Sequence, residues 1–320
     1  MRNYIVQRLL AAIPTIFGIT VLIFLAMRVL PGDPFLAVGG EAAATVRMTE
    51  DQIRQAREQL GLDRPYWQQY LSWIGDIARG ELGRSFWRDE PVRDLIVRRA
   101  PISAEIAILA IVVAWLVGIP IGVLSATRTN SVVDYIARVF AVLFIAIPGF
   151  WLGILIVTAL VLTFLWRPPI TSVDLWVDPW TNLQIVIGPG MVLGFGIAAV
   201  LARFSRSSML EVMGEDYVRT ARAKGLAGRT IIWPHALKNA MLPTITVTGT
   251  AIGGLLGGAV AVETAFSVPG LGLTLVQALN ERDWTIVQNL VLLYGVLFTL
   301  VNLAVDISYS WFDPRIRYGE

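Results

Sequence analysis

Six long apolar runs constrain this chain more than any other feature. They lie at about 9–27, 102–124, 139–166, 183–202, 242–262 and 286–305. A helix needs about 20 apolar residues to cross the ~30 Å hydrocarbon core of a bilayer, and each run comes close to or exceeds that length. Only 16% of the 320 residues are charged, whereas a soluble domain carries about a quarter. The sequence therefore predicts an all-α polytopic membrane protein with six transmembrane helices.

The distribution of arginine predicts the orientation of these helices. Basic residues lie at the N-terminus, in the loops near 126–138 and 203–241, and at the C-terminus. The other two short loops, 167–182 and 263–285, carry only Arg167 and Arg282. Because short cytoplasmic loops are enriched in Lys and Arg, both termini are expected in the cytoplasm. Arg28, at the outer end of the first run, can extend its side chain to the membrane interface.

Four segments follow from this pattern. Residues 1–30 form the N-terminal transmembrane helix, 31–100 a helical external segment, 101–310 a five-helix core that includes the loop 203–241, and 311–320 a cytoplasmic tail. Three helices are predicted externally: one from the capping box at 49–52 to about 61, one from Pro65 to about 78, and one from Pro91 that ends before Pro101. The external segment either only packs on the membrane part or assists at the mouth of a pathway.

Several kinds of chemistry are excluded by composition. The chain has no cysteine and a single histidine, His235, so thiolate sites and multi-histidine metal sites are absent. Neither lysine follows a glycine, so the phosphate loop of ATPases is absent as well. Glu105, Glu263 and Asp306 lie near predicted helix ends, where we expect them to be interfacial and paired. An ion-coupled carrier normally keeps a charge at mid-depth, although an ion site built from backbone carbonyls stays open. We expect no catalytic residue, cofactor or metal in this chain.

The fourth and fifth runs are rich in glycine. The fourth contains Gly188, Gly190, Gly194 and Gly196, and the fifth reads GTAIGGLLGGA at 249–259. Small residues allow transmembrane helices to approach closely. They also allow a helix to bend where a neighbour or water satisfies the backbone. Tight packing and a flexing pathway wall are both consistent with this pattern.

The longest basic interruption lies between these two runs, at 214–243, and holds both lysines of the chain, Lys224 and Lys238. Glu215 and Asp216 open a short helical pattern, Lys224 lies in its last turn and Gly225 follows, an order that favours a helix. Either this helix docks against another protein on the cytoplasmic face, or the segment is a solvated basic loop that only sets topology.

The motif DYVRTARAKGLAGRTIIWPHALKNAMLP, at 216–243, resembles the cytoplasmic signature of binding-protein-dependent ABC importer permeases. The general family pattern is Glu-Ala-Ala, three residues, Gly, nine residues, then Ile-x-Leu-Pro. Ala221, Gly225 and Leu237 match it. Four residues depart from it but resemble the dipeptide, oligopeptide and nickel branch, which reads YVRTARAKG and HALxNA: Arg219, Thr220, His235 and Lys238.

Further motifs extend the resemblance along nearly the whole chain. PGDP at 31–34, QLGLDRPYWQQYLSW at 59–73 and GELGRSF at 80–86 are similar to the external segment of that branch. Residues 210–226, GGAVAVETAFSVPGLG at 257–272 and DPRIRY at 313–318 are similar to its later helices, loop and tail. The resemblance implies the transmembrane fold of a type I ABC importer. The long segment after the first helix implies the first of its two permeases.

The resemblance also implies partners and roles. A second related permease, one or two ABC ATPase subunits that bind ATP and Mg²⁺, and an external solute-binding protein are expected in a bacterial or archaeal plasma membrane, with no nucleic acid. The coupling helix that enters the ATPase would comprise Glu215, Asp216, Tyr217, Val218, Arg219, Thr220, Ala221, Arg222, Ala223, Lys224, Gly225 and Leu226. His235, Leu237, Asn239 and Pro243 would support it. Ala221, Ala223 and Gly225 would allow close seating, while Arg219, Arg222 and Lys224 would pair with acids.

The function expected from the resemblance is ATP-driven import of a peptide-like solute by alternating access. Import of a nickel chelate, glutathione or an oligosaccharide is an alternative within the same family. Two alternatives from other classes are an ATP-independent carrier with six helices, and an anchor or receptor subunit without a pathway of its own.

Overall fold

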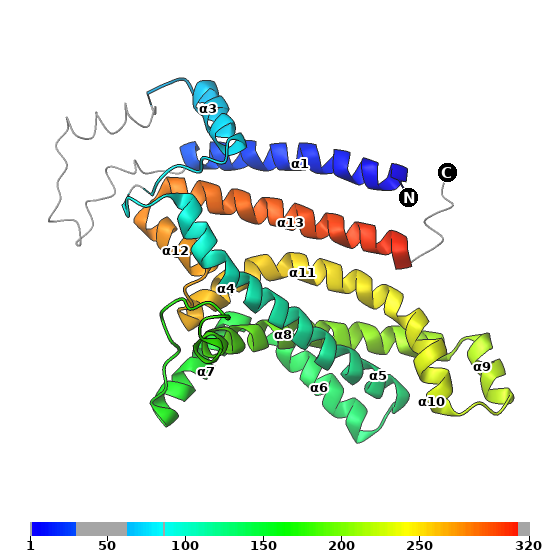
Figure 1. Ribbon diagram of the computed structural model, residues 1–320. Coiled ribbons are helices and arrows are strands. Elements are labelled where there is room, and N and C mark those ends of the chain that lie inside the picture. Colours follow the sequence, from blue (N-terminus) through cyan, green and yellow to red (C-terminus); the bar gives the residue numbers. More distant parts are fainter. Residues whose placement is uncertain (1, 30–62, 86, 313–320) are drawn as a thin grey trace. The chain divides into compact units, whose positions relative to one another are not determined.

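The computed structural model describes residues 2–29, 63–85 and 87–312, and its named elements are helices (Figure 1). The helix predicted at 49–61, the PGDP motif and the tail motif at 313–318 lie outside the described residues. Contacts divide the chain into two compact units. One comprises 1–12, 99–273 and 297–320, and the other comprises 13–98 and 274–296. Each unit is described by itself.

In the second unit, the part of α1 (Arg2–Val29) from residue 13 onward packs on the external helix α3 (Tyr66–Ala78). The rings of Phe24 and Tyr70 meet edge to face with centroids 5.3 Å apart. Arg28 donates a 2.8 Å hydrogen bond to Gln69 Oε1. The polar end of the Arg28 side chain therefore bonds to α3, which is a more specific contact than the interfacial extension expected from the sequence. Pro65 directly precedes α3, so this helix begins close to where the sequence predicted.

The helix α4 (Val92–Val113) runs through Pro101, so the predicted end before Pro101 is wrong. Proline removes one backbone hydrogen bond, but helices in membranes tolerate this where neighbours satisfy the freed carbonyl. A π-helical turn, η3 (Ala114–Gly118), then leads into α5 (Ile119–Thr127). The wider π turn ends two residues before Pro120, whose ring would crowd the preceding turn of a regular α-helix.

The sequence predicted that the third apolar run would be one span, but the structure does not form a single straight helix there. It forms α6 (Val132–Ala146) and α7 (Gly149–Phe164), which are bent by 97°. Pro148 lies between the two helices, and proline disfavours helical angles at the preceding residue. Ile147 accordingly has an extended backbone, with φ −86° and ψ 121°. The structure therefore describes five helices long and apolar enough to span, or six if this bent pair counts as one.

The remaining elements continue from α8 (Pro179–Met213) through α9 (Asp216–Ala223), α10 (Gly228–Ile231) and η4 (Ile232–Leu237) to α11 (Lys238–Phe266), α12 (Leu271–Glu281) and α13 (Trp284–Phe312). In the first unit α8 contacts α5, α6, α7 and α11. Its apolar core joins α4, α8 and α11 through Ile106, Ile185 and Val262, among others. The 35 residues of α8 measure about 50 Å. Because the hydrocarbon core is about 30 Å thick, α8 extends beyond the bilayer.

The glycines of α8 and α11 serve two purposes at different positions. A Cβ atom at Gly194 would lie 2.7 Å from the Val113 side chain, and one at Gly253 would lie 2.8 Å from Phe298. At Gly196, Gly254 and Gly257 the same atom would meet nothing within 4 Å. The first kind packs helices tightly, and the second kind faces open space. Neither of the two interpretations given above therefore applies to all of these glycines.

Candidate functional site

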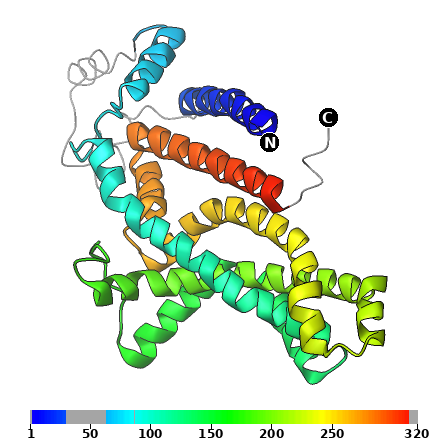
Figure 2. The same cartoon turned by 45° about the vertical axis from the view of Figure 1, so that its right-hand side comes forward.

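The short helix predicted between Glu215 and Gly225 is present as α9. Glu215 is its N-cap residue, Lys224 is its C-cap residue, and Gly225 follows with φ +77°. A left-handed residue just past a helix end satisfies the last carbonyls, and the N–H of Gly225 bonds to the carbonyl of Arg222. Figures 1 and 2 show α9 and α10 beyond the end of α8, in the connection to α11.

Two contacts hold α9 against the chain. The Val218 side chain is fully buried, and it is the buried residue of an otherwise polar helix. The residue before Val218 is Tyr217, whose hydroxyl accepts a 2.8 Å hydrogen bond from Asn239 Nδ2. Asn239 Nδ2 also donates to the carbonyl of His235 at 3.3 Å. One apolar side chain and one polar network therefore fix α9 relative to the start of α11.

The outer surface of α9 carries exposed cations. Arg219, Arg222 and Lys224 are all exposed. Arg219 contacts Asp216 at 3.4 Å, but the two side chains are 72% and 96% exposed. An ion pair so open to water contributes little to stability. Ala223 is also exposed and presents only a methyl group. This surface combines positive charge with room for close approach.

The four residues predicted to support α9 lie in different surroundings. Leu237 packs against a buried cluster that includes Met209 of α8 and Ala240 of α11. His235 and Asn239 are exposed near α9, as described above, and Pro243 is exposed within α11. His235 lies in the π-helical segment η4, which also contains Pro234. The structure therefore brings His235 and Asn239 to α9, while Leu237 packs against residues of α8 and α11 and Pro243 lies further along α11.

Comparison with known proteins decides the family. The family described as binding-protein-dependent transport system inner membrane component matches residues 118–318, and its N-terminal part matches residues 1–107. The chain belongs to this family. It is 40% identical to the dipeptide transport system permease protein DppB of Escherichia coli K12 over 99% of both chains. It is also 40% identical to the glutathione transport system permease protein GsiC of Escherichia coli O6:H1, over 99% of this chain and 100% of that protein. A DppB of Alkalihalophilus pseudofirmus is 36% identical over 99% of this chain and 100% of that protein.

This permease is therefore a multi-pass membrane component of a binding-protein-dependent ABC transport system. Its first unit contains a cavity of about 300 Å³ between the α6–α7 bend, α8 and α11. Phe144, Ile147 and Leu255 line the cavity together with Gly196 and Gly254. These are two of the glycines at which a Cβ would meet nothing. Gly196, Gly254 and the α6–α7 bend therefore lie around the same cavity.

Of the two described carboxylates near helix ends, Glu263 is more buried than the sequence suggested, whereas Glu105 is half-buried. Glu263 is fully buried rather than interfacial, and its Oε2 atom accepts a 2.7 Å hydrogen bond from the N–H of Gly272. Glu105 accepts a 2.7 Å bond from Asn182 Nδ2. The side chain of Asp306 lies outside the described part of the chain. Backbone and amide groups thus partner both described carboxylates.

Sequence reasoning missed a buried charged network around Asp134, which is fully buried at the start of α6. Arg206 of α8 and Ser125 of α5 both bond to it. A signal was present, because Ser131 and Asp134 form a Ser-x-x-Asp capping box. Arg206 gave a second signal, since it lies just past the fourth apolar run. Nothing in the sequence paired the two residues.

Proposed function

We propose that this permease passes a short peptide from an external solute-binding protein to the cytoplasm, and that α9 docks in a groove of a cytoplasmic ATPase subunit. The dipeptide and glutathione permeases that it resembles support a peptide as cargo. A second related permease completes the pathway. ATP and Mg²⁺ bind to one or two ATPase subunits, since this sequence contains no phosphate loop.

The observation that carries this proposal is the way α9 is mounted. Val218 and Tyr217 hold one side of the helix to the chain. The opposite side presents Arg219 and the small residue Ala223 to the surroundings, and Arg222 and Lys224 are exposed as well. A helix that is fixed on one side and cationic on the other is suited to a groove lined with acids. A loop that merely set topology would need no such attachment.

The arginine distribution supports a cytoplasmic position for α9 and for both termini. In this orientation the long C-terminal part of α8 projects into the cytoplasm and carries α9 at its end. Residues 31–100 then face the external side, where the binding protein delivers its cargo. The cytoplasmic position of α9 and the external position of residues 31–100 both follow from the arginine distribution. One measurement of which side of the membrane a residue faces therefore tests both.

The cavity beside the α6–α7 bend forms part of the pathway wall in this proposal. ATP closes the ATPase subunits, their grooves move, and α9 carries the movement into α8 and α11. The pathway then alternates between an outward-facing and an inward-facing state, a two-state change driven by differential binding of ATP. No covalent change in the solute is required.

Docking of α9 is tested by Ala223→Glu in the assembled complex. The substitution keeps a good helix former but places an acid against acids of the groove, and like charges in contact cost several kcal/mol. Uptake of a dipeptide supplied on the binding protein should fall by at least about tenfold, which corresponds to roughly 1.4 kcal/mol. A nickel chelate and an oligosaccharide serve as comparison solutes, which we expect not to be carried.

Ala223→Ser is the matched control, because it changes the size and charge of the side chain very little. We expect it to retain uptake within about twofold of the native chain. Uptake by Ala223→Glu at the native rate would contradict docking through this surface. Uptake by the purified chain in liposomes without any ATPase would instead favour the carrier function.

A further inference from the structure

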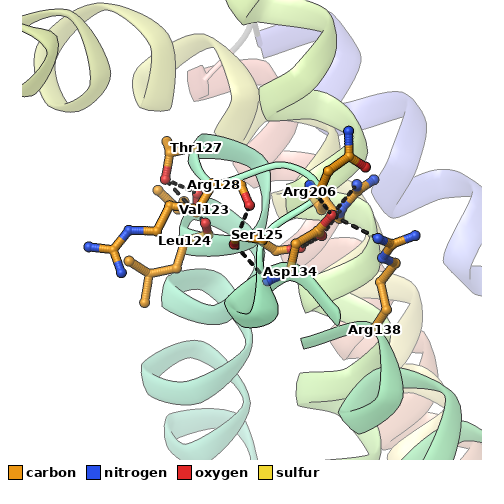
Figure 3. A network of polar contacts seen from close by, with 10 residues as sticks. Val123, Leu124, Ser125, Thr127, Arg128, Asp134, Arg138 and Arg206 are labelled. Carbon is orange, nitrogen blue, oxygen red and sulfur yellow. Dashed lines mark hydrogen bonds and ion pairs between the residues drawn. The ribbon is translucent and has the colours of Figure 1, made fainter. Parts of the chain in front are cut away.

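The Asp134 carboxylate is the most heavily bonded acid in the described part of unit one, and Figure 3 shows its surroundings. Arg206 approaches it with two nitrogens, Nε at 2.9 Å from Oδ1 and Nη2 at 3.2 Å from Oδ2. Ser125 Oγ donates to Oδ1 at 2.5 Å, and the N–H of Asn130 donates to Oδ2 at 3.1 Å. Arg138 adds an ion pair at 3.0 Å. The carboxylate is therefore fully satisfied although it is buried.

These bonds join three helices. Ser125 belongs to α5, Asp134 and Arg138 belong to α6, and Arg206 belongs to α8. The two-pronged contact of a guanidinium with a carboxylate fixes the orientation of both groups as well as their distance. Apolar packing alone allows helices to slide by small amounts. The network thus adds a directional restraint where α5 and α6 meet α8.

The backbones of α5 and of the end of η3 are also in close contact with that of α8 at this place. A Cβ atom at Gly122 would lie 2.6 Å from the carbonyl oxygen of Ala202, and one at Gly118 would lie 2.6 Å from that of Ala198. Glycines four residues apart allow this approach in membrane helices. The two helices therefore interlock one turn from the charged network.

The network lies close to the proposed docking helix. Arg206 precedes the end of α8 at Met213 by about two helical turns, roughly 10 Å along the axis. The connection to α9 then takes only Gly214 and Glu215. In the other direction, α6 leads from Asp134 to Phe144 and Ile147 at the cavity. A continuous path of helix and ion pair therefore connects α9 with the α6–α7 bend.

We propose that Asp134 and Arg206 are positioning residues for transport, which make the ends of α5, α6 and α8 one rigid block that moves with α9. This inference rests on the proposed docking of α9. The block carries the displacement of α9 through α6 to the bend beside the cavity. Without the ion pair α9 still docks, but α8 moves without α6 and the solute is not released.

The test measures a distance inside the assembled complex. Because this chain has no cysteine, spin labels attach to it only at introduced positions, Thr129→Cys in the turn before α6 and Ser207→Cys on α8, both exposed. The distance between the labels should stay the same in the nucleotide-free and ATP-bound complex. If the distance between the labels changes by several ångströms between these states while Asp134 and Arg206 are native, the proposal is overturned.

The variants Arg206→Gln and Asp134→Asn give the functional readout. Solute carried per ATP hydrolysed should fall about tenfold or more, and the label distance should become broad or nucleotide-dependent. Arg203→Gln, an exposed arginine one turn earlier on α8, is the control and should change neither quantity. If Arg206→Gln assembles and keeps the native ratio of transport to hydrolysis, the proposal is wrong.

Cross-linking of α9 to the ATPase separates this proposal from the one on which it rests. In both variants a cysteine at Arg222 should still cross-link to the ATPase subunit. Absence of that cross-link in a chain with native Asp134 and Arg206 would contradict docking itself. If the Arg206 and Asp134 variants keep both the cross-link and the native ratio of transport to ATP hydrolysis, only the proposal of a rigid block is overturned. Should Asp134→Asn fail to assemble, the label distance in the native network still decides.

Discussion

At the scale of single residues, Gly225 shows what the sequence could predict. Its place after Lys224 predicted a helix end, and its φ of +77° agrees with that. By contrast, nothing in one sequence pairs Asp134 with Arg206, because the two residues are 72 positions apart. The Ser-x-x-Asp spacing indicates only the local bond from the Asp134 N–H to Ser131 Oγ. Local chemistry is readable from neighbouring residues, whereas a pairing across helices needs the fold.

The left-handed backbone of Gly225 leads to a prediction. Gly225→Val forces a β-branched residue into this region at a cost of about 1–2 kcal/mol, while asparagine tolerates it. We expect Gly225→Val to lower ATP hydrolysis stimulated by the binding protein, and Gly225→Asn to retain most of it. Gly228→Val is the control, because a Cβ there meets nothing within 4 Å and φ lies outside the left-handed region. Equal activity of Gly225→Val and Gly225→Asn would contradict this explanation.

At the scale of elements, hydropathy predicted where the apolar helices lie but not how each one bends. The run at 139–166 is apolar throughout, so its length suggested one span. Pro148 and the extended backbone of Ile147 turn it by 97°. Pro101 has the opposite outcome, since α4 continues through it. A proline in or beside an apolar run therefore does not by itself predict a break, since α4 continues through Pro101 and the third run turns at Pro148.

The cavity beside this bend gives a second prediction. Gly254→Phe should place an aromatic ring in the space of about 300 Å³ and reduce uptake by at least about tenfold. Assembly with the ATPase should be unchanged, since the ring enters open space rather than a packed contact. Gly254→Ala, whose Cβ meets nothing within 4 Å, should transport normally. Normal uptake by Gly254→Phe would show that the cavity lies outside the pathway.

At the scale of the whole molecule, composition and apolar runs were enough to predict a polytopic all-α protein. The family followed from motifs at 216–243 and elsewhere, and the match over 118–318 confirms it. The partners act through α9 in this account. In the proposed function, a nucleotide-hydrolysing neighbour drives transport through α9, the polar helix anchored by Val218.

The most direct test of this account is a cross-link from Arg222→Cys, in a chain that has no other cysteine. In sealed vesicles that hold the assembled complex, a cysteine-reactive bifunctional reagent should join this position to the ATPase subunit. Trp176→Cys, in the exposed loop before α8, should instead react with a membrane-impermeant reagent added outside. The account is contradicted if Cys at position 222 reacts from outside, or joins only lipid, while the complex still transports its solute.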